Sequence, residues 1–244
     1  ALRAPQLDDP RQSRAVLVLA RRIRLLVRHR RLDAAQREPV GDDRLRVGKL
    51  DLPQLPAALC PQCGEETTLG ERCGACLKDP PAFARTIALF RYEFPVDRLI
   101  QALKYGHQLA LAAWLGHRLG ERLVAADYDL LLPLPLHPSR LRTRGFNQSL
   151  EIARVTSKAL AIPMNPAILT RIRATPPQAE LPLKERGRNV RGAFECAHDL
   201  AGKRILLVDD VMTTGSTLRE AARILKLHGA GQITVAVAAR ALRH

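Results

Sequence analysis

The chain has 244 residues, which is long enough for one α/β domain with a full hydrophobic core and a small additional module. Its formal net charge of +15, with only 4% aromatic residues, favours polyanionic partners such as phosphorylated metabolites, nucleic acid or an anionic membrane surface. The longest N-terminal apolar run covers only residues 15–20, which excludes a membrane-spanning helix there, so we predict a soluble, cytoplasmic protein.

Residues 1–48 come first in chain order, and they are rich in arginine and lack Phe, Tyr and Trp. The apolar spacing over residues 16–27 is compatible with an amphipathic helix whose basic face would contact nucleic acid. A poorly ordered, solvated arm is the interpretation that we favour. We therefore predict a basic, disordered N-terminal arm and assign no chemistry to it.

Residues 49–82 are rich in proline, glycine and cysteine, which is typical of a small loop-rich module. Two Cys-x-x-Cys pairs lie in it, Cys60 with Cys63 and Cys73 with Cys76. Four thiolates from two such turns give the closed tetrahedral site that structural Zn²⁺ prefers. Redox-active or unligated thiols are the alternative, but redox Cys-x-x-Cys motifs usually occur singly. We predict a zinc ribbon whose metal is structural, not catalytic.

Residues 83–244 alternate short apolar strands with longer helical patterns, which is typical of βαβ units around a parallel sheet. Cys196 lies in a short apolar stretch, and we expect it to be a buried strand residue. The main expected strands cover residues 86–92, 129–134, 168–172, 204–208 and 233–239, and the last is expected to close the sheet. The expected helices cover residues 95–104, 109–125, 146–160 and 217–227, and residues 174–191 are a predicted loop. The predicted fold class is therefore α/β, with a parallel sheet and flanking helices.

The most informative segment is residues 205–217, Ile-Leu-Leu-Val-Asp-Asp-Val-Met-Thr-Thr-Gly-Ser-Thr. A buried strand ends in Asp209 and Asp210, and a loop of small residues then opens a helix. At the carboxyl edge of a parallel sheet, the amides and hydroxyls of such a loop can enclose a phosphate. The two carboxylates would repel a bare phosphate but accept hydrogen bonds from sugar hydroxyls.

This segment therefore predicts a sugar-phosphate site, although an ordinary strand-to-helix turn is the alternative. The predicted phosphate-binding residues are Val211, Met212, Thr213, Thr214, Gly215, Ser216 and Thr217. The segment is not a Walker loop, because the Gly-x-x-x-x-Gly-Lys pattern is missing. It resembles the phosphoribosyl diphosphate motif of type I phosphoribosyltransferases, and that resemblance implies their fold.

Further segments resemble the competence protein ComF family over about residues 50–244. They are Lys104-Tyr105-Gly106 and residues 133–138, 140–149, 175–178 and 188–194. The resemblance implies a phosphoribosyltransferase domain behind a cysteine ribbon, and an association with DNA uptake or the use of external DNA. It implies a transferase reaction with less force.

In phosphoribosyltransferases a loop after an early strand binds the diphosphate, and here that loop contains Arg140, Arg142 and Arg144. Their guanidiniums match the charge of a diphosphate, and a solvated basic loop is the alternative. Mg²⁺ bound by the diphosphate and the ribose hydroxyls would stabilise the leaving group. If transfer occurs, Asp209 and Asp210 are the catalytic residues, because they orient the sugar and favour positive charge at its anomeric carbon.

The predicted loop over residues 174–191 lies where these enzymes carry a mobile lid that keeps water from the reacting carbon. Its basic side chains would either form this lid or follow a DNA backbone, and the two interpretations are equally well supported. These lid or DNA-binding residues are Lys184, Arg186, Arg188 and Arg191.

Three functions are compatible with these features. The first is an enzyme of nucleotide metabolism that transfers phosphoribosyl groups to an unknown acceptor. The second is a DNA-uptake protein that binds phosphoribosyl diphosphate and single-stranded DNA and works with uptake machinery, and the third is a structural adaptor. The acidic pair and the phosphate loop argue against the third, while the basic charge and the zinc ribbon favour the second.

Overall fold

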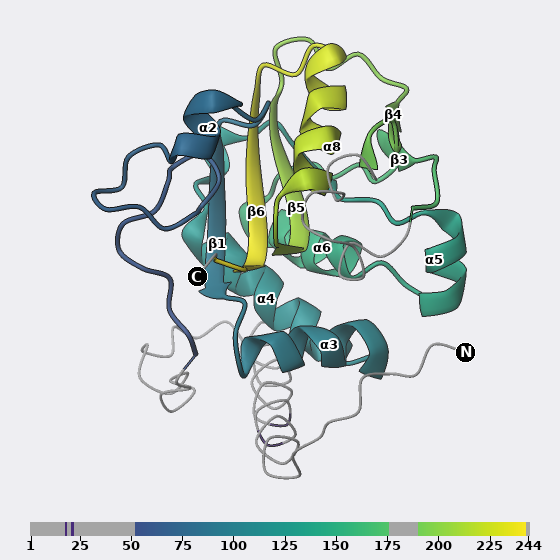
Figure 1. Ribbon diagram of the computed structural model, residues 1–244. Helices are drawn as coiled ribbons and strands as arrows, with labels where there is room; N and C mark the ends of the chain where they lie inside the picture. The colour runs from purple at the N-terminus through teal and green to yellow at the C-terminus, as the bar shows by residue number, and fades with distance from the viewer. Residues whose placement is uncertain (1–17, 19–20, 22–51, 176–189, 243–244) are drawn as a thin grey trace.

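The computed structural model describes residues 18, 21, 52–175 and 190–242 (Figure 1). The predicted basic arm, apart from two positions, lies outside the described residues, as do Lys184, Arg186 and Arg188. None of the helices in the described part of the chain combines the length and the hydropathy that crossing a bilayer requires.

Four parallel strands form the central sheet, in the order β1-β6-β5-β2. Figure 1 shows β1, β6 and β5 side by side. Their bounds are Arg85–Arg91 for β1, Leu130–Pro133 for β2, Arg204–Met212 for β5 and Gln232–Arg240 for β6. Every residue of β6 after the first is buried, because helices cover both faces of the sheet. The predicted parallel α/β sheet is confirmed, but the last strand does not close it, since β6 pairs with β1 on one side and β5 on the other.

Alternate residues of β5 face two separate parts of the core. Leu206 packs with residues of α3, α4 and α6, whereas Leu207 packs with residues of α8. These helices span Val96–Gly106 (α3), Leu109–Arg122 (α4), Gln148–Leu160 (α6) and Ser216–Leu227 (α8). Glycine is required where α4 meets α6, because a Cβ on Gly116 would lie 2.6 Å from the Cβ of Val155.

The cysteine segment packs into the same part of the core as α8. Cys60, Cys63 and Cys76 belong to one buried cluster with Leu218 of α8 and Leu207 of β5. Its second cysteine pair lies at the short helix α2, Gly74–Lys78. The predicted metal ribbon is therefore packed directly against the sheet and α8.

Strand β5 is longer than the strand expected over residues 204–208, because it continues through the acidic pair to Met212. Buried carboxylates are tolerated in a strand only when they have partners, and both have them here, as described below. The acidic pair therefore lies inside the sheet instead of following it.

Three short elements between β2 and β5 complete the fold. A helix, α5 (Pro138–Arg144), replaces most of the loop expected around the arginines, with Gly145 as its left-handed C-cap. Strands β3 (Leu169–Arg171) and β4 (Phe194–Cys196) pair antiparallel. Cys196 is 4% exposed in β4, which confirms the prediction of a buried strand residue. The helix expected over residues 109–125 ends at Arg122, and a 3-10 turn, η1 (Ala125–Asp127), follows.

Candidate functional site

The acidic pair lies at the carboxyl end of β5, buried beneath α3 and α6. Asp209 is 8% exposed and Asp210 is 3% exposed. The Ser149 hydroxyl of α6 donates to Asp209 Oδ1 over 2.7 Å, and the Asp210 amide donates to the same oxygen over 2.8 Å. Lys104 Nζ, in the last turn of α3, lies 2.5 Å from Asp210 Oδ2. The two carboxylates therefore have different partners, and only Asp210 is paired with a cation within salt-bridge distance among the described residues.

These surroundings shift the pKa values of the two carboxyl groups in opposite directions. Burial, and then the neighbouring charge of Asp210, raise the pKa of Asp209 to about 8. Burial alone would raise the pKa of Asp210, but the charge of Lys104 outweighs it and lowers this pKa. Burial alone would lower the pKa of Lys104, but the charge of Asp210 outweighs it and raises this pKa. At neutral pH the site therefore holds one firmly ionised carboxylate and one carboxyl group that exchanges its proton near that pH.

The loop after β5 joins the acidic pair to the start of α8. Gly215 is the N-cap of α8 with a left-handed φ of 76°, which favours glycine. The hydroxyls of Thr214 and Ser216 lie 2.8 Å apart, and the Ser216 amide donates to the Thr214 hydroxyl over 3.3 Å. Backbone amides and hydroxyls are thus gathered at a helix N-terminus, an arrangement that suits an anion.

Two of the predicted phosphate-binding residues contribute packing instead of polar side chains to this loop. Met212 is 1% exposed, and its methyl group would lie 2.5 Å from a Cβ on Gly215. Val211 packs against the apolar core beneath α3 and α4. The polar side chains of the loop come from the half-buried residues that follow, Thr213, Thr214, Ser216 and Thr217.

The three predicted diphosphate-binding arginines lie on α5, and the helix separates them. Residues two positions apart do not face the same side of a helix, and Arg142 is exposed while Arg140 and Arg144 are partly covered. Arg140 donates to the Thr175 carbonyl over 2.7 Å. Arg144 donates to the Gln148 side chain over 2.8 Å and lies over the Tyr105 ring, 5.3 Å from its centre.

Arg144 also stands close enough to the acidic pair for its charge to help lower the pKa of Asp210. The structure therefore brings Arg144 toward the acidic pair and leaves Arg142 on the surface.

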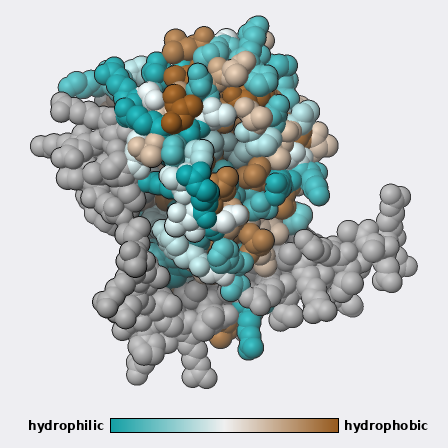
Figure 2. Space-filling model, turned by 90° about the vertical axis from the view of Figure 1, so that its right-hand side faces the viewer, coloured by the Kyte–Doolittle hydropathy of each residue, from teal (hydrophilic) through white to brown (hydrophobic). Residues whose placement is uncertain are grey.

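Figure 2 shows the side of the molecule that lies to the right in Figure 1, and hydrophilic and hydrophobic residues are interspersed on it.

Arg171, the last residue of β3, is a functional candidate that sequence reasoning missed. Its side chain is 7% exposed, donates to the Thr175 hydroxyl over 2.6 Å and lies 5.4 Å from the centre of the Phe194 ring. In the described part of the chain no carboxylate lies within salt-bridge distance of it. Burial, and then the positive charge of Arg140, lower its pKa to about 10, against the attraction of Asp209.

A buried guanidinium without an acidic partner is costly unless a ligand supplies the charge. The sequence signal that could have identified Arg171 was its position as a single arginine within an apolar strand pattern. Lys104 was visible only as part of a family motif, because nothing in the spacing of the sequence places α3 against β5.

Asn147, which follows the three arginines in the sequence, acts as the N-cap of α6. This structural role accounts for Asn147 at this position, and no ligand is needed to explain it. Its side-chain oxygen accepts from the amides of Ser149 and Leu150, and its amide group donates to the Leu134 carbonyl over 3.0 Å. Asn147 thus holds Ser149 in place beneath Asp209.

Arg191 is exposed just before β4, while the other predicted lid residues lie outside the described residues.

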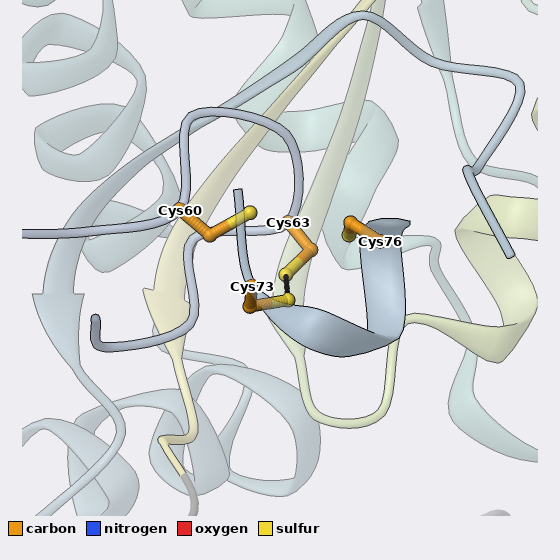
Figure 3. A group of neighbouring side chains, drawn as sticks. All are labelled: Cys60, Cys63, Cys73 and Cys76. Carbon is orange, nitrogen blue, oxygen red and sulfur yellow. Dashed lines mark hydrogen bonds between the residues drawn. The ribbon is translucent and has the colours of Figure 1, made fainter. Parts of the chain in front are cut away.

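The four paired cysteines come together as a candidate metal site (Figure 3). Their sulfur atoms all lie within 4.8 Å of one another, and Cys63 Sγ is 3.5 Å from Cys73 Sγ. A tetrahedral zinc ion with Zn–S bonds of about 2.3 Å would require sulfur atoms roughly 3.8 Å apart. The donor set and the spacing therefore fit Zn²⁺.

The electrostatics of the cluster also suit a cation. Burial raises the pKa of Cys63 to about 11 and raises that of Cys76 as well. Burial opposes ionisation of Cys60 too, but backbone amides, first that of Cys63, lower its pKa to about 7. A bound cation would stabilise the thiolates that burial and mutual proximity disfavour.

The C-terminal part of the chain matches a known domain family. Residues 147–243 match the family of phosphoribosyl transferase domains. With the parallel sheet and the loop after β5, this match defines the fold as phosphoribosyltransferase-like. A purine phosphoribosyltransferase of Pyrococcus horikoshii Ot3 is 22% identical, with a TM-score of 0.33, over 62% of this chain and 75% of that one.

Relatives identify the family more closely. DNA utilization protein YhgH of Escherichia coli O157:H7 is 35% identical over 185 residues, which are 72% of this chain and 82% of that relative. Competence protein F of Haemophilus influenzae is 33% identical over 197 residues, which are 75% of this chain and 84% of that relative. The chain therefore belongs to the competence protein ComF family.

Proposed function

We propose that this chain is a cytoplasmic protein of DNA utilisation that binds phosphoribosyl diphosphate with Mg²⁺, and also single-stranded DNA. In this proposal residues 1–48 are a basic arm, residues 49–82 a zinc ribbon and residues 83–244 the phosphoribosyltransferase-like domain. The observation that carries it is the buried acidic pair, which lies immediately before a loop of amides and hydroxyls at the N-terminus of α8.

The 5-phosphate would bind at the loop after β5, where the dipole of α8 and the hydroxyls of Thr214 and Ser216 favour an anion. The ribose hydroxyls would then meet the carboxyl groups of Asp209 and Asp210. Because Asp210 is held ionised by Lys104, it can only accept hydrogen bonds there, whereas Asp209 can accept or donate as its proton comes and goes.

The diphosphate would be bound toward the side of the site where Arg140, Arg144 and Arg171 stand. Arg171 supports this assignment, because its buried charge lacks a carboxylate partner among the described residues. Mg²⁺, carried by the diphosphate and ribose oxygens, would neutralise the leaving group. The side chains named here would bind and orient the sugar and its charged ends.

Single-stranded DNA is proposed from the net charge of +15 and from the names of the relatives. Aromatic residues are only 4% of the chain, so base stacking would be limited and binding would depend mainly on phosphates. Arg191 and its basic neighbours in the sequence are the candidate contacts, and sequence preference is expected to be absent.

Calorimetric titration with phosphoribosyl diphosphate and Mg²⁺ tests the small-molecule part of the proposal. Asp210→Asn, which removes the charged acceptor that Lys104 keeps ionised, worth about 1.5–3 kcal/mol, should weaken binding about tenfold or more. Asp129→Asn is the matched control, because Asp129 pairs with Arg204 at the opposite end of β5. Equal affinities for the wild type and both variants would contradict the assignment of the sugar site.

A phosphoribosyl transfer activity with an unknown acceptor is the second candidate, and the pKa of Asp209 favours it. A carboxyl group with a pKa of about 8 is largely protonated at pH 7, but its deprotonated fraction, which grows as the pH rises, can take up a proton from an incoming acceptor. Diphosphate release measured against a panel of nucleobases and amines tests this activity. Release that stays at the level of the acceptor-free control would reject it and leave binding as the function.

A further inference from the structure

Arg240, the last residue of β6, connects the cysteine segment to the proposed phosphate loop. Its Nε donates to the Cys63 carbonyl over 2.9 Å, and its Nη2 donates to Glu65 Oε2 over 2.9 Å. Its Nη1 donates to the Thr213 carbonyl over 2.5 Å. One guanidinium therefore contacts the backbone of a candidate metal ligand and the first threonine of the loop.

The sheet places Arg240 between these two segments. Its side chain is 3% exposed, and its Cα lies opposite Arg91 of β1 and Met212 of β5. Nη1 also donates to the carbonyls of Met212, over 3.3 Å, and Ala241. A buried arginine whose donors are used in this way holds the groups around it in one arrangement, because losing an acceptor would leave a donor unsatisfied.

A second contact joins the other end of the ribbon to the helix that follows the loop. Arg219, in the first turn of α8, donates to the Asp79 carbonyl over 2.9 Å and to Asp79 Oδ2 over 3.1 Å. Asp79 is the C-cap of α2, which carries Cys76. Each cysteine pair is thus linked through an arginine to the loop or to α8.

Thr86 also connects the turn that carries the first cysteine pair to Met212, whose side chain packs beneath the phosphate loop. Thr86 of β1 donates through its hydroxyl to the Gln62 carbonyl over 2.7 Å, and the same hydroxyl lies 3.9 Å from Met212 Sδ. The Met212 side chain in turn occupies the space next to Gly215. A shift of the Cys60–Cys63 turn would therefore disturb both the Met212 packing and the Arg240 hydrogen bonds.

We infer that Arg240 is a positioning residue that couples metal binding at the four cysteines to ligand binding at the phosphate loop. The inference rests on the proposed function for the identity of the ligand. With metal bound, the Cys63 and Glu65 acceptors keep Arg240 in place, and Arg240 keeps the Thr213 carbonyl turned inward. The following loop amides are then free to face an anion. Because coupling between two binding sites is reciprocal, the ligand should in turn raise the affinity of the cysteines for the metal.

Two measurements on the full, zinc-loaded chain test the coupling. The first is hydrogen–deuterium exchange of the peptide that contains residues 212–218, before and after zinc removal with a chelator, and it needs no ligand. The second is the zinc affinity, measured by equilibrium competition with a chromogenic chelator, with and without phosphoribosyl diphosphate and Mg²⁺. Both are made on the wild type, Arg240→Lys and Glu65→Gln. The matched control is Arg204→Lys, an arginine at the opposite end of the sheet that is bound to Asp129.

In the wild type, zinc removal should accelerate exchange in residues 212–218, and the ligand should raise the zinc affinity on the order of tenfold. Arg240→Lys should show fast loop exchange even with zinc bound, and its zinc affinity should not respond to the ligand. Glu65→Gln, which leaves the cysteines and Arg240 intact, should give an intermediate response, and Arg204→Lys should behave as the wild type.

Different failures separate this inference from the proposed function. Zinc-dependent loop exchange without any ligand binding would support the link from the cysteines through Arg240 to the loop and contradict the proposed function. Ligand binding with loop exchange that is indifferent to zinc and to Arg240→Lys would overturn the coupling and leave the proposed function standing. A chain that purifies without metal would also overturn the coupling.

Discussion

At the scale of single residues, the ion pair between Lys104 and Asp210 organises the candidate site. Lys104 comes from α3 and Asp210 from β5, and their charged atoms are 2.5 Å apart in a largely buried environment. The pair allows one carboxylate to remain ionised inside the sheet, while its neighbour Asp209 has a raised pKa. Removing either partner would leave an uncompensated charge.

Lys104→Met should therefore lower the free energy of unfolding at neutral pH, by at most about 3 kcal/mol because the lysine side chain is 21% exposed. The lowered pKa of Asp210 gives stability that is present above the ordinary carboxyl range and is lost as the pH falls through the folded pKa. The difference in the free energy of unfolding between the variant and the wild type should therefore become smaller as the pH falls. Denaturant unfolding from pH 7 to pH 3 measures it, with Lys158→Met on the exposed side of α6 as the control. An equal loss at every pH would contradict this account.

Sequence reasoning at this scale found the residues whose types and spacing are diagnostic by themselves. The acidic pair and the two Cys-x-x-Cys turns are local patterns, so neighbouring positions carry the signal. Lys104 and Arg171 were not identified as site residues, because their roles depend on contacts with residues that are far away in the chain. Such contacts leave no periodic trace in the sequence.

At the scale of elements, the strands and helices of the sheet region were largely predictable, because β5 and β6 are nearly continuous apolar runs and the helices are amphipathic. The polar elements were not. Helix α5 was expected to be a loop, because this short polar segment has no apolar period. Pro138 in its first turn, the His137 N-cap and the Gly145 C-cap are the local signals of the helix. The strand expected to end before Asp209 continues, because tertiary partners allow the acidic pair to be buried.

The loop between β5 and α8 gives a prediction at this scale. Gly215→Ala should destabilise the protein, because φ is 76° and the new Cβ would meet Met212, and it should abolish binding of phosphoribosyl diphosphate. Gly202→Ala is a matched control, with φ of 70° and no atom within 4 Å of the new Cβ. The backbone cost of about 1–2 kcal/mol should be common to both. Thermal unfolding and calorimetry compare them, and unimpaired binding by Gly215→Ala would show that the loop is only a structural turn.

The cysteine segment gives a second prediction. The purified chain should contain one zinc ion, and Cys60→Ser and Cys73→Ser should lose it, because each ligand contributes to a site whose metal binding stabilises the fold. Cys196→Ser is the control, since Cys196 lies in β4 outside the cluster. Elemental analysis by mass spectrometry measures the metal. Full zinc content in the two ligand variants would rule out this site.

At the scale of the whole molecule, the cysteine segment, the sheet and α8 share one part of the core, and the formal net charge of the chain is +15. A chain with a net charge of +15 should bind single-stranded DNA without sequence preference and release it as salt rises. Alanine at Lys184, Arg186 and Arg188 should lower the salt slope by about one unit per lost phosphate contact, whereas Thr213→Ala should leave it unchanged. Fluorescence anisotropy at several salt concentrations measures the slope. No binding at low salt would remove DNA from the proposed function.

We propose above that a phosphoribosyl diphosphate site lies at the carboxyl end of β5. A crystal structure of the zinc-loaded chain with phosphoribosyl diphosphate and Mg²⁺ tests it most directly. We predict the 5-phosphate at the amides of residues 213–217, the ribose hydroxyls at Asp209 and Asp210, and the diphosphate toward Arg144 and Arg171. A ligand bound elsewhere on the chain, or a loop that stays empty at saturating ligand, would contradict the account.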